Sequence, residues 1–352
     1  MQNPAPSASA STSAAPLGGT LGTFAGVFTP SVLTILGIIL FLRLGYVVGA
    51  AGLGRALVII ALANAISILT SISLAAIATN LKVKGGGDYY LISRTLGPGF
   101  GGALGLVLFL AQSVSIGFYA IGFGEAVAAL LPGTPWLAPR TIAMAAVLFL
   151  FVFAWLGADW ATRFQFGVMA ILTAALLVFF AGGLPQWDGA LLAANWRSPQ
   201  GAPSFFVLFA IFFPAVTGFT QGVSMSGDLK DAGKSLPVGT FMAVGVSILV
   251  YFGVAIIFAA VLPNATLSSD YGAMKRVAIW GPLIDAGVVA ATLSSAMASF
   301  LGAPRILQSL AGDRLFKVLN PFSRGAGPTN NPRPVSYTHL RAHETILPIS
   351  YS

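Results

Sequence analysis

The sequence contains no cysteine, only two histidines and very few charged residues. Without cysteine, neither a disulfide framework nor a thiolate metal site can form. Charged residues make up 8% of the chain and hydrophobic residues 56%, whereas an ordinary soluble domain carries about 25% charge. A soluble fold of this length would lack the polar side chains that cover a surface in water, so lipid is the expected outer solvent.

The motifs of common enzyme classes are also missing. The sequence has no GxxxxGK[ST] loop and no HExxH pair, and the GGG of KVKGGGDYY lacks the strand and helix of a nucleotide-binding loop. Both histidines, His339 and His343, fall near the C-terminus with no further metal ligands around them. We therefore expect a protein that is not an enzyme and that has no cofactor and no metal centre.

Apolar runs divide the chain into about eight membrane spans, since each span needs ~20 apolar residues to cross a hydrocarbon core of ~30 Å. The runs lie near residues 28–49, 54–79, 101–131, 139–157, 164–183, 205–227, 237–262 and 283–311. Two shorter amphipathic segments, 88–96 and 270–280, are expected to lie at the membrane interface. The pattern predicts an all-α integral membrane protein whose direct partner is the lipid bilayer.

The net charge of +8 comes from Lys and Arg residues between the apolar runs. Because they form no basic patch interleaved with aromatics, no nucleic acid partner is expected. Cytoplasmic loops of membrane proteins are enriched in Lys and Arg. The N-terminus is therefore predicted to be cytoplasmic, in a plasma (inner) membrane, because this orientation places more Lys and Arg residues on the inner side than on the outer side. The inner side would have Lys82, Lys84, Arg94, Arg163, Lys230, Lys234, Arg305, Arg314, Lys317 and Arg324. The outer side would have Arg55, Arg140, Arg197, Lys275 and Arg276.

The two ends of the chain differ from the apolar region between them. Residues 1–20 are rich in Ala, Ser and Pro without charge, which is typical of a disordered tail, and they lack the features of a signal peptide. Residues 21–327 form the predicted transmembrane domain. Residues 328–352 are predicted to be a loop and a non-native tail, because the segment after Arg333 resembles translated vector sequence. A short cytoplasmic tail is the alternative.

Two spans carry helix breakers at comparable depth and five spans apart. The first span has Pro30 and Gly37, and the sixth has Pro214 and Gly218. A repeat of five helices must be inserted upside down relative to its copy, and interrupted helices at matching positions indicate a binding site at the membrane midplane. The alternative explanation is that Gly and Pro are common in membrane helices.

A broken helix leaves backbone groups that ions can satisfy. The half-helices that begin just after Gly37 and Gly218 point free amides at the cavity with about +0.5 charge, which suits an anion. The carbonyls of the half-helices that end there suit a bare cation. They belong to Leu33, Thr34, Ile35, Leu36, Pro214 and Thr217.

Side chains near the midplane add to these backbone groups. Tyr119, Ser294 and Ser295 are oxygen donors that suit Na+ or K+. The alternatives are helix packing for the serines and an aromatic belt for the tyrosine. Arg43 and Glu125 are charges inside spans, and as a pair they would close the outer vestibule. Otherwise Arg43 reaches the headgroups and Glu125 faces water.

These residues lie within longer motifs, namely GIILFLRLGYVVGAAG, KGGGDYYLISRTLGPGFGGALG, FYAIGFGEAV, FFPAVTGFTQGVSMSGDLKDAGKSLPVGT and ATLSSAMASFLGAPRILQSLAGDRLF. From about Leu21 to Asn331 the chain resembles the cation-chloride cotransporter family, of the sodium-potassium-chloride kind, within the amino acid, polyamine and organocation superfamily. The resemblance implies a LeuT-like fold of 5+5 inverted repeats with broken helices 1 and 6.

The resemblance also implies a secondary active symporter that couples chloride to sodium and potassium by alternating access, with inorganic ions as partners. A homodimer is left open. Because the family core has twelve spans, the chain is expected to be truncated at its C-terminus and unable to transport alone.

The resemblance implies a site for each transported ion. Sodium would be bound by Leu33, Leu36, Ala291, Ser294 and Ser295, and potassium by Thr34, Ile35, Tyr119, Pro214 and Thr217. Chloride would lie on the amides of Gly37, Ile38 and Ile39 and, at a second site, on those of Gly218, Phe219 and Thr220. Arg43 and Glu125 match the family's extracellular gate.

The chain departs from the family pattern at two of these positions. Thr34 stands where the family commonly has Asn, and Leu36 where it has an aromatic, although backbone ligands tolerate both. The paired serines favour sodium coupling and Tyr119 favours potassium coupling. An amino acid permease of the same fold is the alternative, with the first break binding a substrate carboxylate. A non-transporting membrane scaffold is a third hypothesis.

Overall fold

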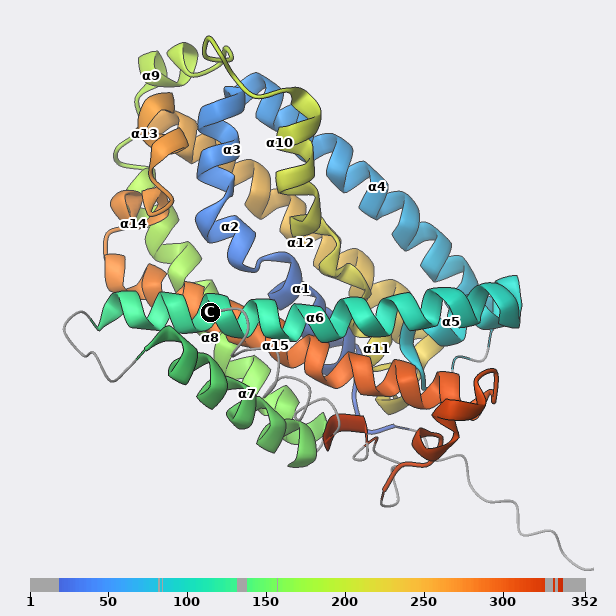
Figure 1. The fold of residues 1–352 in the computed structure, drawn as a ribbon. Coiled ribbons are helices and arrows are strands. Elements are labelled where there is room, and N and C mark those ends of the chain that lie inside the picture. Colours follow the sequence, from blue (N-terminus) through green and yellow to red (C-terminus); the bar gives the residue numbers. More distant parts are fainter. Residues whose placement is uncertain are drawn as a thin grey trace, which may run out of the picture.

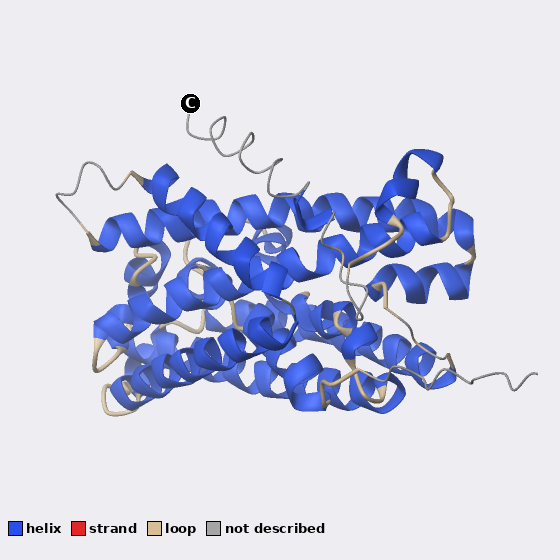
Figure 2. Cartoon of the chain, turned by 90° about the horizontal axis from the view of Figure 1, so that it is seen from below, coloured by secondary structure: helices blue, strands red, loops and turns tan. Residues whose placement is uncertain are grey.

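The computed structural model describes residues 19–81, 83, 85–131, 138–156, 158–326, 332 and 335–337, without the side chains of 158 and 159. Within these ranges the backbone is almost wholly helical (Figure 2), with one isolated bridge between Leu21 and Leu229. The predicted tail at residues 1–20 lies outside the described residues except for 19 and 20. Most of the segment 328–352, with His339 and His343, also lies outside them.

Eight helices of the described chain are long and apolar enough to cross a membrane, as the sequence predicts. The first span comprises η1 (Phe24–Phe28), α1 (Thr29–Ile35) and α2 (Ile38–Leu42) and continues into α3 (Leu44–Ala51). The second to fifth are α4 (Leu53–Asn80), α6 (Pro98–Leu130), α7 (Pro139–Leu156) and α8 (Ala158–Gly183). The sixth comprises α10 (Phe205–Phe212), η2 (Phe213–Val216), η3 (Gly218–Thr220), α11 (Gln221–Ser224) and η4 (Ser226–Asp228). The last two are α12 (Ala232–Val261) and α15 (Gly281–Gly312).

Short helices connect these spans or follow the last of them. They are α5 (Gly87–Leu96), α9 (Gly189–Ala194), α13 (Asn264–Ser269), α14 (Ala273–Val277) and η5 (Lys317–Phe322). Helix α5 covers the first predicted amphipathic segment, and α14 lies within the second. In Figure 1, α5 lies at one end of the molecule, and α9, α13 and α14 lie toward the other.

Each of the first three spans packs against the span five positions later. Helix α1 contacts η3 and α11, α4 contacts α12, and α6 crosses α15 (Figure 1). The buried residues of α15 are mostly Ala, Ser and Gly, which allow the close approach on which helix packing in lipid depends. Two repeats of five helices that pack on each other place each span beside its counterpart in the other repeat, and this is the pairing that is observed.

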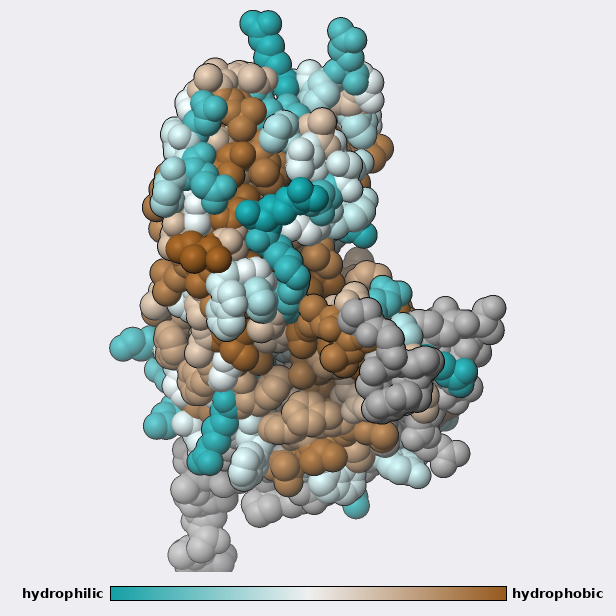
Figure 3. Space-filling model, turned by 90° about the vertical axis from the view of Figure 1, so that its left-hand side faces the viewer, coloured by the Kyte–Doolittle hydropathy of each residue, from teal (hydrophilic) through white to brown (hydrophobic). Residues whose placement is uncertain are grey.

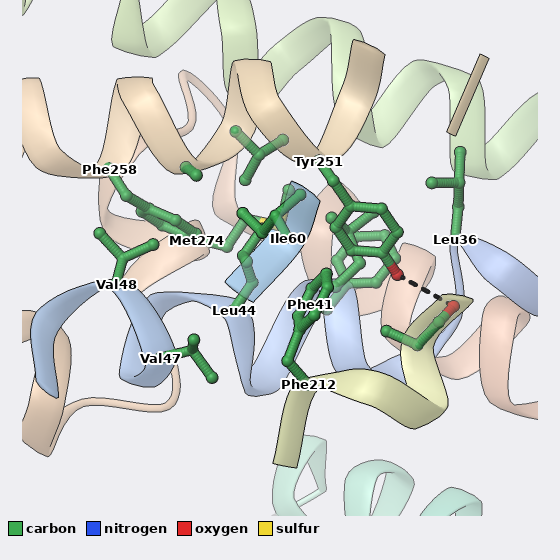
Figure 4. Close-up of a cluster of buried hydrophobic side chains, with 14 of the residues drawn as sticks. Leu36, Phe41, Leu44, Val47, Val48, Ile60, Phe212, Tyr251, Phe258 and Met274 are labelled. Atoms are coloured by element: carbon green, nitrogen blue, oxygen red, sulfur yellow. Dashed lines mark hydrogen bonds between the residues drawn. The ribbon is translucent and has the colours of Figure 1, made fainter. Parts of the chain in front are cut away.

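The core lies between the broken first span and helix α12. Figure 4 shows Tyr251 beside Phe212, with Phe41 and Leu44 near them, and the rings of Phe212 and Tyr251 meet edge to face at 5.2 Å. Lipid is as apolar as these side chains, so their packing is held by close contact and not by exclusion of water.

Large apolar side chains also face outward along the spans. Leu69, Val114, Phe206 and Leu249 are each more than 60% exposed, and Figure 3 shows hydrophobic residues over much of one face. Such a surface is stable only against hydrocarbon. The protein is therefore an integral membrane protein.

Glycine positions in α12 provide a test of this packing. A Cβ added at Gly239 would lie 2.6 Å from Cβ of Val27, whereas one at Gly245 meets nothing within 4 Å. We expect Gly239→Ala to destabilise the protein by about 1–3 kcal/mol through overpacking. Gly245→Ala should be neutral or slightly stabilising, because Ala is the better helix former. Thermal unfolding in detergent measures both, and equal melting temperatures for the two variants would contradict the packing of α12 on the first span.

Candidate functional site

The first span is broken at Leu36 and Gly37. Helix α1 ends at Ile35, and Gly37 has extended backbone (φ −85°, ψ −156°) before α2 begins at Ile38. Among the described backbone hydrogen bonds, none has the amide of Gly37, Ile38 or Ile39 as its donor. These amides therefore form the positive end of a half-helix inside the molecule.

The sixth span is interrupted in a different way. From Phe213 to Thr220 it changes from α-helix to two short 3₁₀ turns, with Thr217 between them. The predicted break is confirmed, but the backbone here is wound more tightly than an α-helix, whereas the backbone at the first break is extended. A Cβ at Gly218 would lie 2.6 Å from Cγ2 of Thr34 and 2.9 Å from the amide of Ile35. Only glycine allows this approach, so the two breaks are in direct contact.

A cavity of about 950 Å³ lies beside the two breaks. It is lined by twelve of the residues singled out from the sequence, namely Thr34, Ile35, Gly37, Ile38, Ile39, Arg43, Tyr119, Glu125, Pro214, Thr217, Gly218 and Ser295. The other candidates do not line it and lie in the surrounding helices, namely Leu33, Leu36, Ala291, Ser294, Phe219 and Thr220. All five potassium candidates thus line one cavity, whereas of the sodium candidates only Ser295 lines it.

Oxygen atoms from the first and eighth spans converge at Gly37. A Cβ built there would lie 3.0 Å from the Thr34 carbonyl, 3.4 Å from Oγ of Ser295 and 3.8 Å from the Leu33 carbonyl. The neighbouring Ser294 is 1% exposed, and its Oγ has no hydrogen-bond partner. A buried hydroxyl without a partner is uncommon and needs an explanation.

Several carbonyls at the breaks already accept hydrogen bonds from side chains. The buried Tyr251 of α12 donates to the Ile35 carbonyl at 2.6 Å and lies 3.5 Å from that of Ala215. The Thr217 hydroxyl donates to the Pro214 carbonyl at 2.9 Å. Because a carbonyl has two lone pairs, these bonds leave one site on each oxygen.

Two buried serines hold the sixth span in the same way. The Ser67 hydroxyl donates to the Val216 carbonyl at 2.8 Å, and that of Ser31 donates to Phe219 at 3.0 Å. Sequence reasoning missed these residues together with Tyr251. For Tyr251 the signal was present, since a tyrosine in the middle of an apolar span is the same feature that singled out Tyr119.

Polar residues of the third and sixth spans also line the cavity. Gln112 and Ser115 come from α6 and Gln221 from α11. The Oε1 atoms of both glutamines are buried without a hydrogen-bond partner. Nothing in the sequence distinguishes these residues from other polar side chains in the spans.

Arg43 and Glu125 both line the cavity but form no ion pair with each other in the described structure. The Arg43 guanidinium lies 4.5 Å above the ring of Tyr271, in the loop before α14. A cation over an aromatic face is attracted by the ring quadrupole. The predicted gate pair thus shares one cavity, with Tyr271 as the partner of the arginine.

The end of the molecule near α5 is held by ion pairs. Arg305 of α15 lies 2.6 Å from Asp228 of η4, and Arg94 of α5 lies 2.7 Å from Asp313. The hydroxyl of Tyr89 donates to the same Asp313 at 2.7 Å. Burial, and after it this hydrogen bond, raises the pKa of Tyr89. Helices α5 and α15 and the end of the sixth span are therefore joined there.

Comparison with known proteins places this architecture. The amino acid permease family matches residues 26–331. Solute carrier family 12 member 1 of Mus musculus is 36% identical over 88% of this chain and 34% of its own length. Solute carrier family 12 member 2 of Squalus acanthias is 35% identical over 88% of this chain and 31% of its own. The chain spans about a third of the length of these curated relatives.

The fold is also found among solved structures. The substrate-bound outward-open state of a Na+-coupled sialic acid symporter matches 95% of this chain and 73% of that chain, with a TM-score of 0.61 and 17% identity. This likeness shows the fold, and it confirms the LeuT-like architecture predicted from the sequence. The relatives are solute carriers, permeases and a symporter and not enzymes. The resemblance to the cation-chloride cotransporters is confirmed, and the chain belongs to the amino acid permease family.

Proposed function

We propose that the protein is a secondary active symporter that couples chloride to sodium and potassium across a plasma (inner) membrane by alternating access. The observation that carries the proposal is the contact between two broken helices beside one cavity. Amides, carbonyls and hydroxyls from four spans meet there. Half-helix ends at mid-membrane depth bind substrates and coupling ions in transporters of this kind.

Chloride is proposed to bind at the backbone amides of the two breaks. The first site comprises Gly37, Ile38 and Ile39, whose amides have no backbone partner in the described structure. The second comprises Gly218, Phe219 and Thr220. Of these three residues only Gly218 lines the cavity, so the second site would lie at its edge.

The cations are proposed to bind at oxygen atoms on either side of the first break. Potassium would occupy the cavity among Thr34, Ile35, Tyr119, Pro214 and Thr217, all of which line it. Sodium would lie behind that wall with Leu33, Leu36, Ala291, Ser294 and Ser295. The convergence of Ser295 with the carbonyls of Leu33 and Thr34 supports this location, and a cation would explain the unpartnered hydroxyl of Ser294.

An amino acid permease is the second candidate function. The cavity volume of about 950 Å³ favours it, because this space exceeds what single ions need. The free amides at Gly37 would then hold a substrate carboxylate. The two functions differ in whether cation uptake requires chloride.

Uptake of rubidium, a potassium tracer, into vesicles containing the full-length protein tests the proposed function. We expect uptake to require both chloride and sodium on the same side. Gly37→Val and Gly218→Val should lower the apparent chloride affinity about five-fold or more, since they fill the space in which the backbone meets the ion. Conservative changes at Ile38 and Ile39 are matched controls that keep the amides. Rubidium uptake without chloride would exclude the proposal.

Side-chain oxygens should separate the two cation sites. We expect Ser294→Ala to raise the sodium requirement of rubidium uptake with a smaller change in rubidium affinity, and Tyr119→Phe to do the reverse. A desolvated cation that loses one ligand forfeits about 1–3 kcal/mol, or roughly five- to hundred-fold in affinity. Because both cations would bind beside one cavity, linkage makes each variant change both affinities to some extent. The test is therefore which of the two affinities each variant changes more. If both variants change the two affinities equally, the assignment of separate sites is wrong.

The gate residues should act as a pair during the transport cycle. Arg43 and Glu125 line one cavity. When the cavity closes, pairing of the opposite charges lowers the free-energy cost of burying each of them. We expect Arg43→Glu and Glu125→Arg each to lower rubidium uptake at least ten-fold, and the double swap to recover part of it. A Tyr271→Leu variant controls for the cation–π contact seen here. A swap no better than the single variants would show that the two residues do not pair.

A further inference from the structure

The cavity beside the two breaks has a polar wall that the proposed ion sites do not use. Gln112 of α6, Gln221 of α11 and Ser299 of α15 all line it. Ser299 lies about one helical turn beyond Ser295, which lines the same cavity, in the direction of Arg305. The polar lining therefore continues from the first break along α15 toward the α5 end of the molecule.

Two polar side chains meet at Gly302, where α6 crosses α15 and α11 packs against α15 (Figure 1). A Cβ added at Gly302 would lie 2.3 Å from Oε1 of Gln112 and 3.0 Å from Oγ of Ser224, the last residue of α11. Two oxygen atoms from different helices thus approach one point on α15. Only glycine leaves room for them there.

The oxygen atoms at this point are buried without hydrogen-bond partners. Ser224 is 2% exposed, and neither its Oγ nor Oε1 of Gln112 has a partner in the described structure. Oε1 of Gln221, about one turn before Ser224 on α11, is also buried and unpartnered. We refer to Gln112, Gln221 and Ser224 as the oxygen cluster. Oxygen atoms withdrawn from water without a donor cost free energy, and a bound cation would offset this cost.

The oxygen cluster lies between two cavities. A second cavity of about 410 Å³ is lined by Gly86 and Arg305, among others. Nη1 of Arg305 donates to the Ser224 carbonyl at 3.2 Å. From the other side, the ideal Cβ of Gly87 lies 3.6 Å from Oγ of Ser224. Ser224 is therefore in contact with the residues that border the second cavity, while Gln112 and Gln221 line the first.

The chemistry of the oxygen cluster suits weak binding of an alkali cation. Carbonyl and hydroxyl oxygens are ligands of hard cations, and α11 carries no charge. The positive charge in contact with the cluster is that of Arg305, which lies 2.6 Å from Asp228 and is offset by it. A site along an ion path must bind strongly enough for the ion to enter and weakly enough for it to leave. Neutral oxygens without a carboxylate ligand meet this requirement.

We propose that the oxygen cluster is a second binding site for the transported alkali cation, on its path between the potassium site and the α5 end. The inference rests on the proposed function, which places potassium beside Tyr119. Tyr119 and Gln112 are seven residues apart and share one face of α6. A cation that leaves Tyr119 binds the oxygen cluster and enters the second cavity when Arg305 and Asp228 separate.

Rubidium affinity measured from each side of the membrane tests this site. In vesicles of known orientation that contain the full-length protein, rubidium is supplied on the α5 side or on the opposite side. We expect Ser224→Ala and Gln112→Leu each to lower the apparent rubidium affinity on the α5 side about five-fold or more, with a smaller change on the opposite side. Tyr119→Phe should lower the affinity on both sides, because the potassium site is reached from either side.

Ser115→Ala is the matched control for Ser224→Ala. Ser115 also lines the first cavity, but its hydroxyl already donates to the Ala111 carbonyl at 2.8 Å. We expect this variant to leave the rubidium affinity on both sides unchanged. If Ser224→Ala and Gln112→Leu behave as Ser115→Ala does, the proposal is wrong. A lower chloride affinity on the α5 side with unchanged rubidium affinity would assign the cluster to the anion and would also overturn it.

Gly302 provides a variant that keeps all three oxygen ligands. The methyl group of Gly302→Ala would lie 2.3 Å from Oε1 of Gln112 and should displace it, so rubidium affinity on the α5 side should fall. Gly312→Ala, on the same helix, meets nothing within 4 Å and is the control. Equal rubidium affinities for the two glycine variants would show that Gln112 is not a ligand. These variants decide the question if Ser224→Ala or Gln112→Leu does not fold.

Thermal unfolding separates a failure of this inference from a failure of the proposed function. A cation that binds the folded state raises the melting temperature without transport and without chloride. In chloride-free buffer, rubidium should therefore stabilise Ser115→Ala more than Ser224→Ala. Equal stabilisation would contradict the site even if rubidium uptake requires chloride. If uptake requires no chloride, the proposed function fails, and a difference between the two serine variants would still establish the cation site.

Discussion

The need to satisfy backbone groups inside a membrane determines most of this structure. Where a span is interrupted, its amides and carbonyls have no water to bind. The protein supplies hydroxyl donors from neighbouring helices to the carbonyls, and Tyr251, Ser67 and Ser31 all act in this way. The amides of the first break receive no such partner in the described structure. The carbonyls are thus partly occupied by protein, whereas the amides have no backbone acceptor, and the proposed chloride site would use these amides.

Glycine brings the two interrupted spans together. The contact between Gly218 and the end of α1 leaves no room for a side chain, so the two half-helix termini are placed side by side and their ions would share one electrostatic environment. In a medium of low dielectric constant, ions of opposite sign at neighbouring sites attract each other, which lowers the free-energy cost of binding each ion there. In the proposed function, coupling between cation and anion would follow from this proximity.

Much of the fold could be predicted from the sequence, because its signals are local. Hydrophobic length determines the eight spans, and the Gly and Pro positions locate both breaks. The interactions that complete the site are tertiary, and local sequence patterns indicate them only weakly. Nothing near Arg43 indicates Tyr271, which follows it by more than two hundred residues. Ser294 and Ser295 were assigned together, yet adjacent residues on a helix point about 100° apart, and only Ser295 lines the cavity.

The two ends of the molecule differ in a way that is relevant to the proposed alternating access. At the α5 end, Arg305 and Arg94 are bound to carboxylates of other elements, whereas at the opposite end Arg43 and Glu125 are apart. The exposed pair at Arg94 is weak by itself, but the pair at Arg305 is more buried and joins α15 to the end of the sixth span. In the proposed alternating access, opening this end would require that pair to separate, and the free-energy cost of breaking an ion pair rises with its burial.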